Sequence, residues 1–157
     1  MSKATIESFY AAFARLDGDA MQACYAANAH FEDEAFSLDG ARQIGGMWRM
    51  LCEAVKGKPE ARAAWKLDVS RVTDRSAHWE AHYLFSATGR KVLNRIDAEF
   101  EFDRAGLIVR HRDRFDFWAW SRQALGLPGL LLGWSPLLRR KVRTQAAANL
   151  KRFLQQD

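Results

Sequence analysis

Four consecutive segments in the second half of the chain alternate apolar and polar residues. Short turn-forming stretches such as Thr88-Gly89 separate them. Alternation with a period of two is typical of strands, and short links of this kind join neighbouring strands into antiparallel hairpins. The pattern therefore predicts an antiparallel sheet of four strands, over residues 65–73, 77–88, 91–102 and 107–118.

The first half of the chain has a helical period instead. Residues 4–16 place apolar side chains three and four positions apart, and the same spacing returns from Gly40 to Val55. Such a spacing is typical of amphipathic helices. Between these two helices, a short helix is expected after the LDGD stretch, followed by a strand over residues 29–36. Three N-terminal helices packed on one antiparallel sheet make an α+β fold.

After Trp120 the pattern changes to an apolar linker and a last helix. Ser135 precedes Pro136, which is the order of a helix cap and a first helical residue. We expect this helix to reach about Leu154 and to pack an apolar stripe on the body or on a partner. The chain has 157 residues and no internal repeat, so one domain is expected, with residues 1–120 as its α+β part and residues 121–157 as a C-terminal basic amphipathic helical extension.

The whole positive excess of the chain lies in this extension. The net charge is +5, and residues 121–157 carry seven Lys or Arg against one Asp, whereas residues 1–120 are close to neutral. A basic helix can meet phosphates or anionic lipid, but a solvated outer face is the commoner reason for such a pattern. We therefore expect no nucleic-acid partner and keep membrane contact through the tail as a less favoured alternative.

The sequence argues against several other classes of protein. No run reaches the ~18 apolar residues of a membrane span, and the start lacks the apolar block of a signal peptide, so a cytoplasmic location is expected. His78 and His82 have a spacing seen in zinc sites, but on a strand they stand roughly 13 Å apart. No phosphate-binding loop or CxxC motif is present. The sequence thus predicts neither a metal nor a cofactor.

The order of helix, helix, strand, helix and four long strands resembles the nuclear transport factor 2-like superfamily. Two segments carry the likeness, FYAAFARLDGDAMQACYAANAHFEDE over residues 9–34 and FEFDRAGLIVRHRDRFD over residues 100–116. The resemblance covers about residues 4–120. It implies a cone-shaped fold with a curved antiparallel sheet, as in ketosteroid isomerases, SnoaL-like polyketide cyclases and limonene-epoxide hydrolases. It also implies a homodimer through the open face of the sheet.

The first of these segments is most similar to a ketosteroid isomerase. The resemblance places Asp33 on the proton-shuttling aspartate of that family, at the end of the first strand. The oxyanion-donating tyrosine of the family falls on Phe9, with Tyr10 about 100° further around the helix. The second donor falls near Asp97 or Ala98. The oxyanion hole is therefore missing or rebuilt, which argues against steroid isomerisation.

The second segment is most similar to epoxide hydrolases and SnoaL-like proteins. Epoxide hydrolases use an Asp, Arg, Asp triad, and the resemblance keeps the last aspartate at Asp113. The other two positions fall on Glu80 and His82, and a His beside a carboxylate is an acid and base pair suited to neutral pH. SnoaL-like cyclases need only a well-placed carboxylate or His, and this sequence is compatible with them.

The sequence gives conflicting indications of which face of the 77–88 strand points inward. Its alternation alone places an aromatic face with Trp79 and Tyr83 inside, whereas the resemblance places Glu80 and His82 inside. We favour the resemblance, because both faces of a cone-shaped sheet can be covered.

The other candidate residues follow from shared strand faces. His111 and Asp113 share one face of the last strand, and Asn94 shares a face with Ile96 and Ala98 on the strand before it. Asp33 has apolar neighbours on its own face and could carry a raised pKa; the alternative is a strand-end carboxylate that caps a helix or forms a salt bridge.

The leading hypothesis is a cofactor-independent enzyme that acts on a small, mostly apolar molecule by isomerisation, cyclisation or water addition. The alternative is a non-catalytic ligand-binding or protein-interaction module of the same fold. The stretch LPGLLLGWSPLL is expected to close the mouth of the cone, to sit in a dimer seam or to contact a membrane, in that order. The candidate catalytic residues are Asp33, His82 and Asp113, and the candidate substrate-binding residues are Glu80, Asn94, Tyr10, Trp48 and His111.

Overall fold

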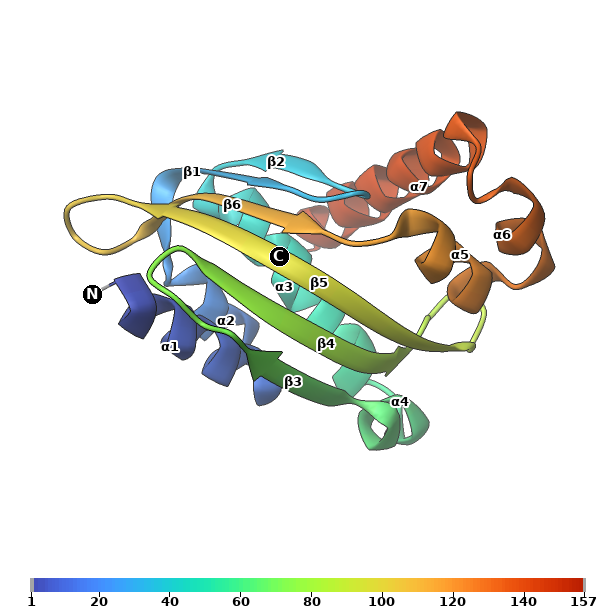
Figure 1. The fold of residues 1–157 in the computed structure, drawn as a ribbon, viewed down its shortest axis with the longest axis horizontal. Helices are drawn as coiled ribbons and strands as arrows, with labels where there is room; N and C mark the ends of the chain where they lie inside the picture. Colours follow the sequence, from blue (N-terminus) through green and yellow to red (C-terminus); the bar gives the residue numbers. More distant parts are fainter. Residues whose placement is uncertain (1, 157) are drawn as a thin grey trace.

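The computed structural model, which describes residues 2–156, is built around one curved, open sheet of six strands (Figure 1). Their order across the sheet is β2-β1-β6-β5-β4-β3. The four strands of the second half pair as antiparallel neighbours, as predicted, whereas β1 joins the sheet parallel to β6. The strands are β1 (Tyr25–Glu32), β2 (Ser37–Asp39), β3 (Lys66–Ser70), β4 (Ser76–Leu84), β5 (Lys91–Phe102) and β6 (Ile108–Arg114).

Helices cover one face of this sheet, which confirms the α+β class. In Figure 1, α1, α2 and α3 lie behind the sheet, and its other face is open toward the viewer. No helix within residues 2–156 is long and apolar enough to cross a membrane. The helices are α1 (Ser2–Ala14), α2 (Gly18–Gln22), α3 (Ala41–Lys56), α4 (Pro59–Ala64), α5 (Phe117–Leu125), α6 (Leu127–Leu132) and α7 (Pro136–Gln155).

Large apolar side chains fill the space between the helices and the sheet. The stripe at helical spacing on α1 buries Ile6, Phe9 and Phe13, and α3 buries Trp48 against the same core. From the sheet, inward-facing residues alternate with exposed ones along β5, which is the expected pattern for a strand covered on one side. The apolar faces of the helices and of the strands therefore pack into one core.

Local capping explains where the sequence-based boundaries were wrong. The strand predicted over residues 107–118 ends at Arg114, because the side chain of Asp116 accepts a hydrogen bond from the Ala119 N–H and begins α5. The predicted linker therefore contains α5 and α6. The cap at Ser135 is confirmed, since its Oγ accepts from the Leu137 N–H at 3.2 Å. The first strand begins and ends four residues earlier than predicted, at Tyr25 and Glu32.

The C-terminal helices cover the end of the sheet at the β4–β5 hairpin. Phe117 and Trp120 of α5 are buried against Val92 of β5, and Leu138 and Val142 of α7 pack on the same cluster. The predicted apolar side of the last helix thus contacts the body. Between α5 and α7, however, the leucines of α6 are exposed. This part of the LPGLLLGWSPLL stretch does not close the fold.

Candidate functional site

Strand register brings two carboxylates together on the inner face of the sheet. β1 pairs with β6 so that Phe31 faces His111 and Glu32 faces Arg112. Asp33 follows directly after β1, close enough to Asp113 for the charge of that carboxylate to act on it. Neighbouring strands lie about 4.8 Å apart, and side chains two positions apart share a face. Asp33 and Asp113 therefore both follow the inward-facing pair of Phe31 and His111.

Asp113 is held by a chain of buried hydrogen bonds. Trp48 Nε1–H donates to Tyr25 Oη at 3.0 Å, and Tyr25 Oη–H donates to His111 Nδ1 at 2.7 Å. His111 Nε2–H then donates to Asp113 Oδ1 at 2.8 Å. His111 is 0% and Asp113 3% exposed. Because a carboxylate can only accept, the contact with Asp113 places a proton on His111 Nε2, where it fixes the carboxylate of Asp113.

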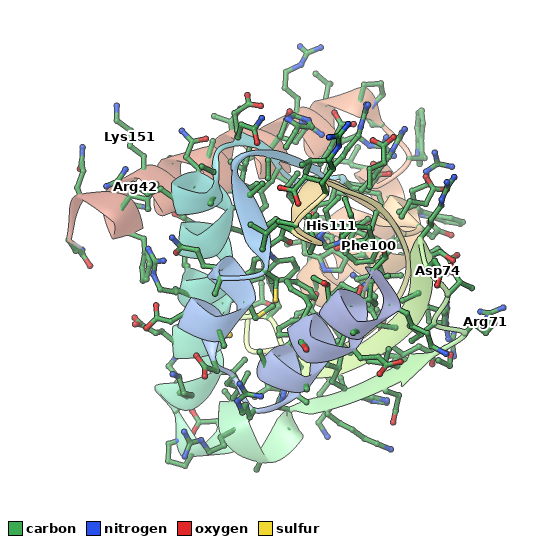
Figure 2. All side chains as sticks on the ribbon, turned by 90° about the vertical axis from the view of Figure 1, so that its left-hand side faces the viewer. Arg42, Arg71, Asp74, Phe100, His111 and Lys151 are labelled. Carbon is green, nitrogen blue, oxygen red and sulfur yellow. The ribbon has the colours of Figure 1, made fainter. Side chains whose placement is uncertain are left out.

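Aromatic rings surround the imidazole of His111. Its ring centroid lies 4.2 Å from Phe100, 4.9 Å from Phe31 and 5.6 Å from Phe9. Figure 2 shows His111 and Phe100 together inside the molecule, while Lys151 projects outward. The imidazole and the carboxylate that it contacts are therefore shielded from bulk water, which strengthens electrostatic interactions at this position.

Asp33 sits in a turn that fixes one of its carboxylate oxygens. Oδ1 accepts the N–H groups of both Ala35 and Phe36 at 2.7 Å, and the Asp33 N–H donates to the Phe36 carbonyl at 2.9 Å. Within residues 2–156, Oδ2 makes no hydrogen bond. The second oxygen is thus available to carry or accept a proton.

The surroundings of Asp33 raise its pKa from 3.8 to about 7. Burial is the main cause, and the negative charge of Asp113 adds to it. The two backbone N–H groups and the positive charge of Arg143 act in the opposite direction. Of the two expectations from the sequence, the raised pKa agrees with the structure; in place of a helix cap or a salt bridge, Asp33 accepts the N–H groups of Ala35 and Phe36 in a turn. A carboxyl group that titrates near neutral pH can both donate and accept protons.

The last helix closes over this turn. Arg143 Nη1 of α7 donates to the carbonyl oxygens of Asp33 at 3.3 Å and Glu34 at 3.1 Å. Arg139, one turn earlier, forms an ion pair with Glu34 at 3.1 Å. Two basic residues of the C-terminal extension therefore position the segment that carries Asp33.

Two buried hydrogen-bond donors near Asp113 have no partner. Tyr10 Oη and Trp79 Nε1 make no hydrogen bond within the described part of the chain, and their rings lie 6.1 Å apart. Burial and the charge of Asp113 raise the pKa of Tyr10 well above its usual value, so this phenol stays protonated. Buried donors without partners are rare in proteins, so these two could receive an acceptor atom of a ligand.

The half-buried hydroxyl of Tyr83 lies on the Asp33 side of this cluster. Tyr83 Oη accepts a hydrogen bond from Trp120 Nε1 at 2.8 Å. Burial raises the pKa of Tyr83 to about 12, and the charge of Asp33 contributes to the rise. Asn94 faces the same interior, as its shared face with Ile96 predicts, and is 8% exposed. Its amide makes no hydrogen bond to any residue from 2 to 156.

The inward placement of Glu80 and His82 is wrong. Cross-strand pairing puts Glu80 opposite Arg95 and His82 opposite Leu93, on the face that the helices leave uncovered. The bulky aromatic side chains of Trp79 and Tyr83 take the inner face, because burying them removes far more apolar surface from water. The structure therefore does not bring His82 or Glu80 to Asp33 and Asp113.

On this outer face, Glu80 belongs to a separate charged group. His78 contacts Glu80 through Nε2 and Asp97 through Nδ1, each at 2.8 Å. These two contacts raise the pKa of His78, and the same imidazole lowers the pKa of Glu80. The imidazole that pairs with Asp113 is His111, which the sequence had suggested only as a substrate contact.

Sequence reasoning missed three residues of the site. Tyr25 lies before the strand predicted over residues 29–36, although its parity with Phe31 could have placed it on the inner side of β1. An inward-facing Trp79 was predicted only by the alternation of β4, which was not the favoured indication. Arg143 gave no signal, because its contact with the Asp33 turn spans 110 residues of sequence. Trp48 and Tyr10, which the sequence suggested as substrate contacts, are both buried.

Solved structures show the same fold at low sequence identity. An LEH-like epoxide hydrolase from M. tuberculosis matches with a TM-score of 0.57 and 20% identity over 83% of this chain and 94% of its own. A proposed polyketide cyclase from Xanthomonas campestris matches with a TM-score of 0.57 and 16% identity over 78% and 95%. A protein with a ketosteroid isomerase-like fold from Catenulispora acidiphila, solved with trimethylamine, matches with a TM-score of 0.58 and 16% identity over 80% and 94%.

The family itself is identified from the sequence. No curated protein is similar enough in sequence to match. The sequence profile of the SnoaL-like domain matches residues 6–111, which include most of α1, the strands β1 to β5 and the first part of β6 up to His111. This range is more than half of the chain and agrees with the nuclear transport factor 2-like resemblance of the sequence. The chain belongs to the SnoaL-like domain family.

Proposed function

We propose that this protein is a cofactor-independent acid–base enzyme that acts on a small, mostly apolar molecule with a carbonyl group. Asp33 is its proton-transferring residue. The observation that carries the proposal is a carboxyl group with a pKa of about 7 and an unpaired Oδ2, next to a second carboxylate fixed by His111. General acid–base catalysis works best when the pKa of the catalytic group is near the working pH.

The groups around Asp33 can perform the other steps of such a reaction. The Asp113 carboxylate, which accepts a hydrogen bond from His111, raises the pKa of Asp33 and so favours the protonated form of Asp33 until a base is needed. Tyr10 Oη and Trp79 Nε1 supply two unpaired donors for a carbonyl oxygen that gains negative charge. The aromatic rings supply apolar contacts for the rest of the substrate.

The proposed reaction is proton transfer at the carbon next to the carbonyl. Ionised Asp33 removes the proton through Oδ2, the two donors stabilise the enolate oxygen, and protonated Asp33 returns the proton to the same or another carbon. Isomerisation and cyclisation both follow this scheme. Water addition, as in the epoxide hydrolase neighbour, would use the same carboxylates to activate water, but the arginine beside them, Arg143, donates to the backbone carbonyls of Asp33 and Glu34.

The test needs no knowledge of the natural substrate. A panel of small cyclic enones and diketones is incubated with the protein in D₂O, and proton NMR follows exchange at the carbon next to the carbonyl. We expect the wild-type protein to accelerate exchange of at least one compound, and Asp33→Asn to lose about 100-fold or more of that rate. The rate should rise with pH through about 7, because the base must be ionised.

The control variant is Asp74→Asn, which removes an exposed carboxylate far from the site. It should exchange the panel at the wild-type rate. Exchange that Asp33→Asn leaves unchanged would remove Asp33 from the mechanism. Chemical-shift changes that show binding, without exchange of any compound, would contradict the proposed enzyme activity. They would favour the alternative below.

The alternative is a non-catalytic ligand-binding module, and the packing around His111 favours it. Phe9, Phe31 and Phe100 fill the interior beside the imidazole, so a ligand must displace side chains to reach Asp113. This alternative predicts saturable binding with equal affinity in the wild-type protein and in Asp33→Asn at pH 5, where both side chains are neutral.

A further inference from the structure

An exposed apolar surface stands at the end of the molecule formed by α6. Its side chains are 48–74% exposed, although they are leucines and a tryptophan. In Figure 1, α6 projects beyond the sheet at the end opposite α1. Contiguous exposed apolar surface of this kind marks a contact site more often than an ordinary protein surface. We call it the α6 patch, and it consists of Leu127, Leu130, Leu131, Leu132, Trp134 and Leu137.

Close packing on the other side of α6 holds these side chains outward. A Cβ on Gly129 would lie 1.9 Å from the Ser121 carbonyl oxygen, and a Cβ on Gly133 would lie 2.1 Å from Ser121 Oγ. Only glycine allows the backbone of α6 to approach α5 this closely. Trp118 Nε1 also donates to the Leu130 carbonyl at 3.2 Å. The leucines therefore face solvent because the glycine side of α6 is fixed against α5.

The chain segment that carries the patch has charged side chains of one sign. Residues 117–156 contain seven Lys or Arg and no Asp or Glu. Arg139 and Arg143 are engaged with the Asp33 turn, while Arg140 and Lys141 are exposed beside Leu137.

A basic surface cleft borders the other end of α6. It is lined by Arg90, Lys91, Arg95 and Arg122, together with Ala119 and Gln123. The Arg90 guanidinium comes within 3.2 Å of the position that a Cβ on Gly126 would take, immediately before Leu127. Cationic groups therefore flank the apolar patch on both sides.

We propose that the α6 patch docks this protein on the surface of an anionic lipid bilayer. Leucine and tryptophan side chains beside Lys and Arg are the composition that inserts into the headgroup region, and lipid phosphates would lie in the basic cleft. A second copy of the chain is a poorer occupant, because two positively charged faces would repel each other. The docking is peripheral, since α6 has six residues.

Vesicle flotation of the full chain tests this proposal. The vesicles contain phosphatidylcholine alone or with roughly a quarter phosphatidylglycerol. We expect binding to the anionic vesicles at least about tenfold tighter than to neutral ones, weakened by salt. The double variant Leu130→Ser/Leu131→Ser should lose about tenfold or more, and so should Arg122→Gln/Arg140→Gln/Lys141→Gln. Leu51→Ser, at an exposed leucine of α3, is the matched control and should bind like the wild type.

Far-UV circular dichroism and the unfolding midpoint establish that each variant is folded. Two results would overturn the proposal directly: equal or no binding to the two vesicle types, and full binding by the double leucine variant. A dimer in sedimentation that this variant converts to a monomer would show instead that a second copy covers the patch. Binding to a polyglutamate peptide without vesicle binding would identify an acidic protein partner and would also overturn it.

Discussion

At the scale of single residues, Asp33 and Asp113 are adjacent carboxyl groups with different support for their charge. Asp113 accepts a hydrogen bond from the buried imidazole of His111, whose orientation Tyr25 fixes. Asp33 has only backbone N–H groups from its turn and a more distant cation, Arg143, on α7. Two negative charges this close in a poorly hydrated site are costly, so one of them is held back as the neutral acid. Burial and the charge of Asp113 together raise the pKa of Asp33, so Asp33 is the group that stays protonated up to neutral pH.

The raised pKa of Asp33 predicts how stability depends on pH. The unfolded chain has an Asp pKa near 3.8 and the folded chain about 7, so between these values the folded state binds more protons. The free energy of unfolding should therefore decrease as pH rises from about 4 to about 7 and then level off. Asp33→Asn removes this titration, so its free energy of unfolding should decrease less than that of the wild type. The difference in stability between variant and wild type should shift by about 1–2 kcal/mol in favour of the variant between pH 4 and pH 8. This is less than the full pKa shift implies, because Asp33 keeps some contact with water.

Urea unfolding at a series of pH values measures this difference. Asp74→Asn, at an exposed loop position that Figure 2 shows pointing away from the interior, is the control and should follow the wild-type profile. Parallel profiles for Asp33→Asn and wild type would mean that Asp33 titrates as in the unfolded chain.

At the scale of elements, α7 links the C-terminal extension to the site. Gly46 of α3 lets α7 approach closely, since a Cβ there would lie 2.5 Å from Leu154 Cδ2. The helix then carries Arg143 over the turn that contains Asp33. An element far from β1 in the sequence thereby sets both the position and the charge environment of the proposed proton-transferring group.

Replacing Arg143 should therefore raise the pKa of Asp33 above 7. Arg143→Gln removes a positive charge that favours ionised Asp33 while keeping a donor for the backbone carbonyls. The measurement is a titration of the Asp33 carboxyl carbon by NMR, with Arg140→Gln, exposed on the same helix, as the matched control. A lowered pKa would show that the turn opens to water without Arg143, so that anchoring outweighs charge.

Periodicity in the sequence was enough to predict most elements but only part of the site. Helical and alternating stripes identified α1, α3, α7 and the four later strands, and most of these elements turn their apolar residues toward the core. The end of β6 was missed because the cap at Asp116 starts a helix within an alternating pattern. The site depends on the parallel register of β1 and β6 and on Tyr25, which no local pattern encodes. For β4 the alternation was right, and the resemblance misplaced His82.

At the scale of the whole molecule, the open face of the sheet differs from the α6 end. It carries opposite charges in cross-strand pairs, such as Glu99 with Arg114 at 3.7 Å and Glu101 with Arg110 at 3.8 Å. Pairs this exposed contribute little to the stability of a monomer. A surface of alternating charge can, however, complement a second copy of itself across a two-fold axis.

We therefore expect a homodimer through this open face whose stability falls with salt. Sedimentation should give a dimer mass at low ionic strength and a shift toward monomer at about 0.5 M NaCl, where screening is strong. Glu99→Lys places a like charge directly opposite Arg112 and beside Arg114, with which Glu99 forms an ion pair, and should weaken the dimer about tenfold or more. Glu7→Lys makes the same charge change at an exposed position of α1 and should leave the mass unchanged.

Two results separate this interface from its alternatives. A monomer at every salt concentration would contradict self-association through the open face. A dimer that tolerates Glu99→Lys but is lost in Leu130→Ser/Leu131→Ser would place the contact on the α6 patch, where two positive ends would have to meet. Salt would then strengthen that dimer by screening the repulsion, the opposite of its expected effect on the open-face dimer.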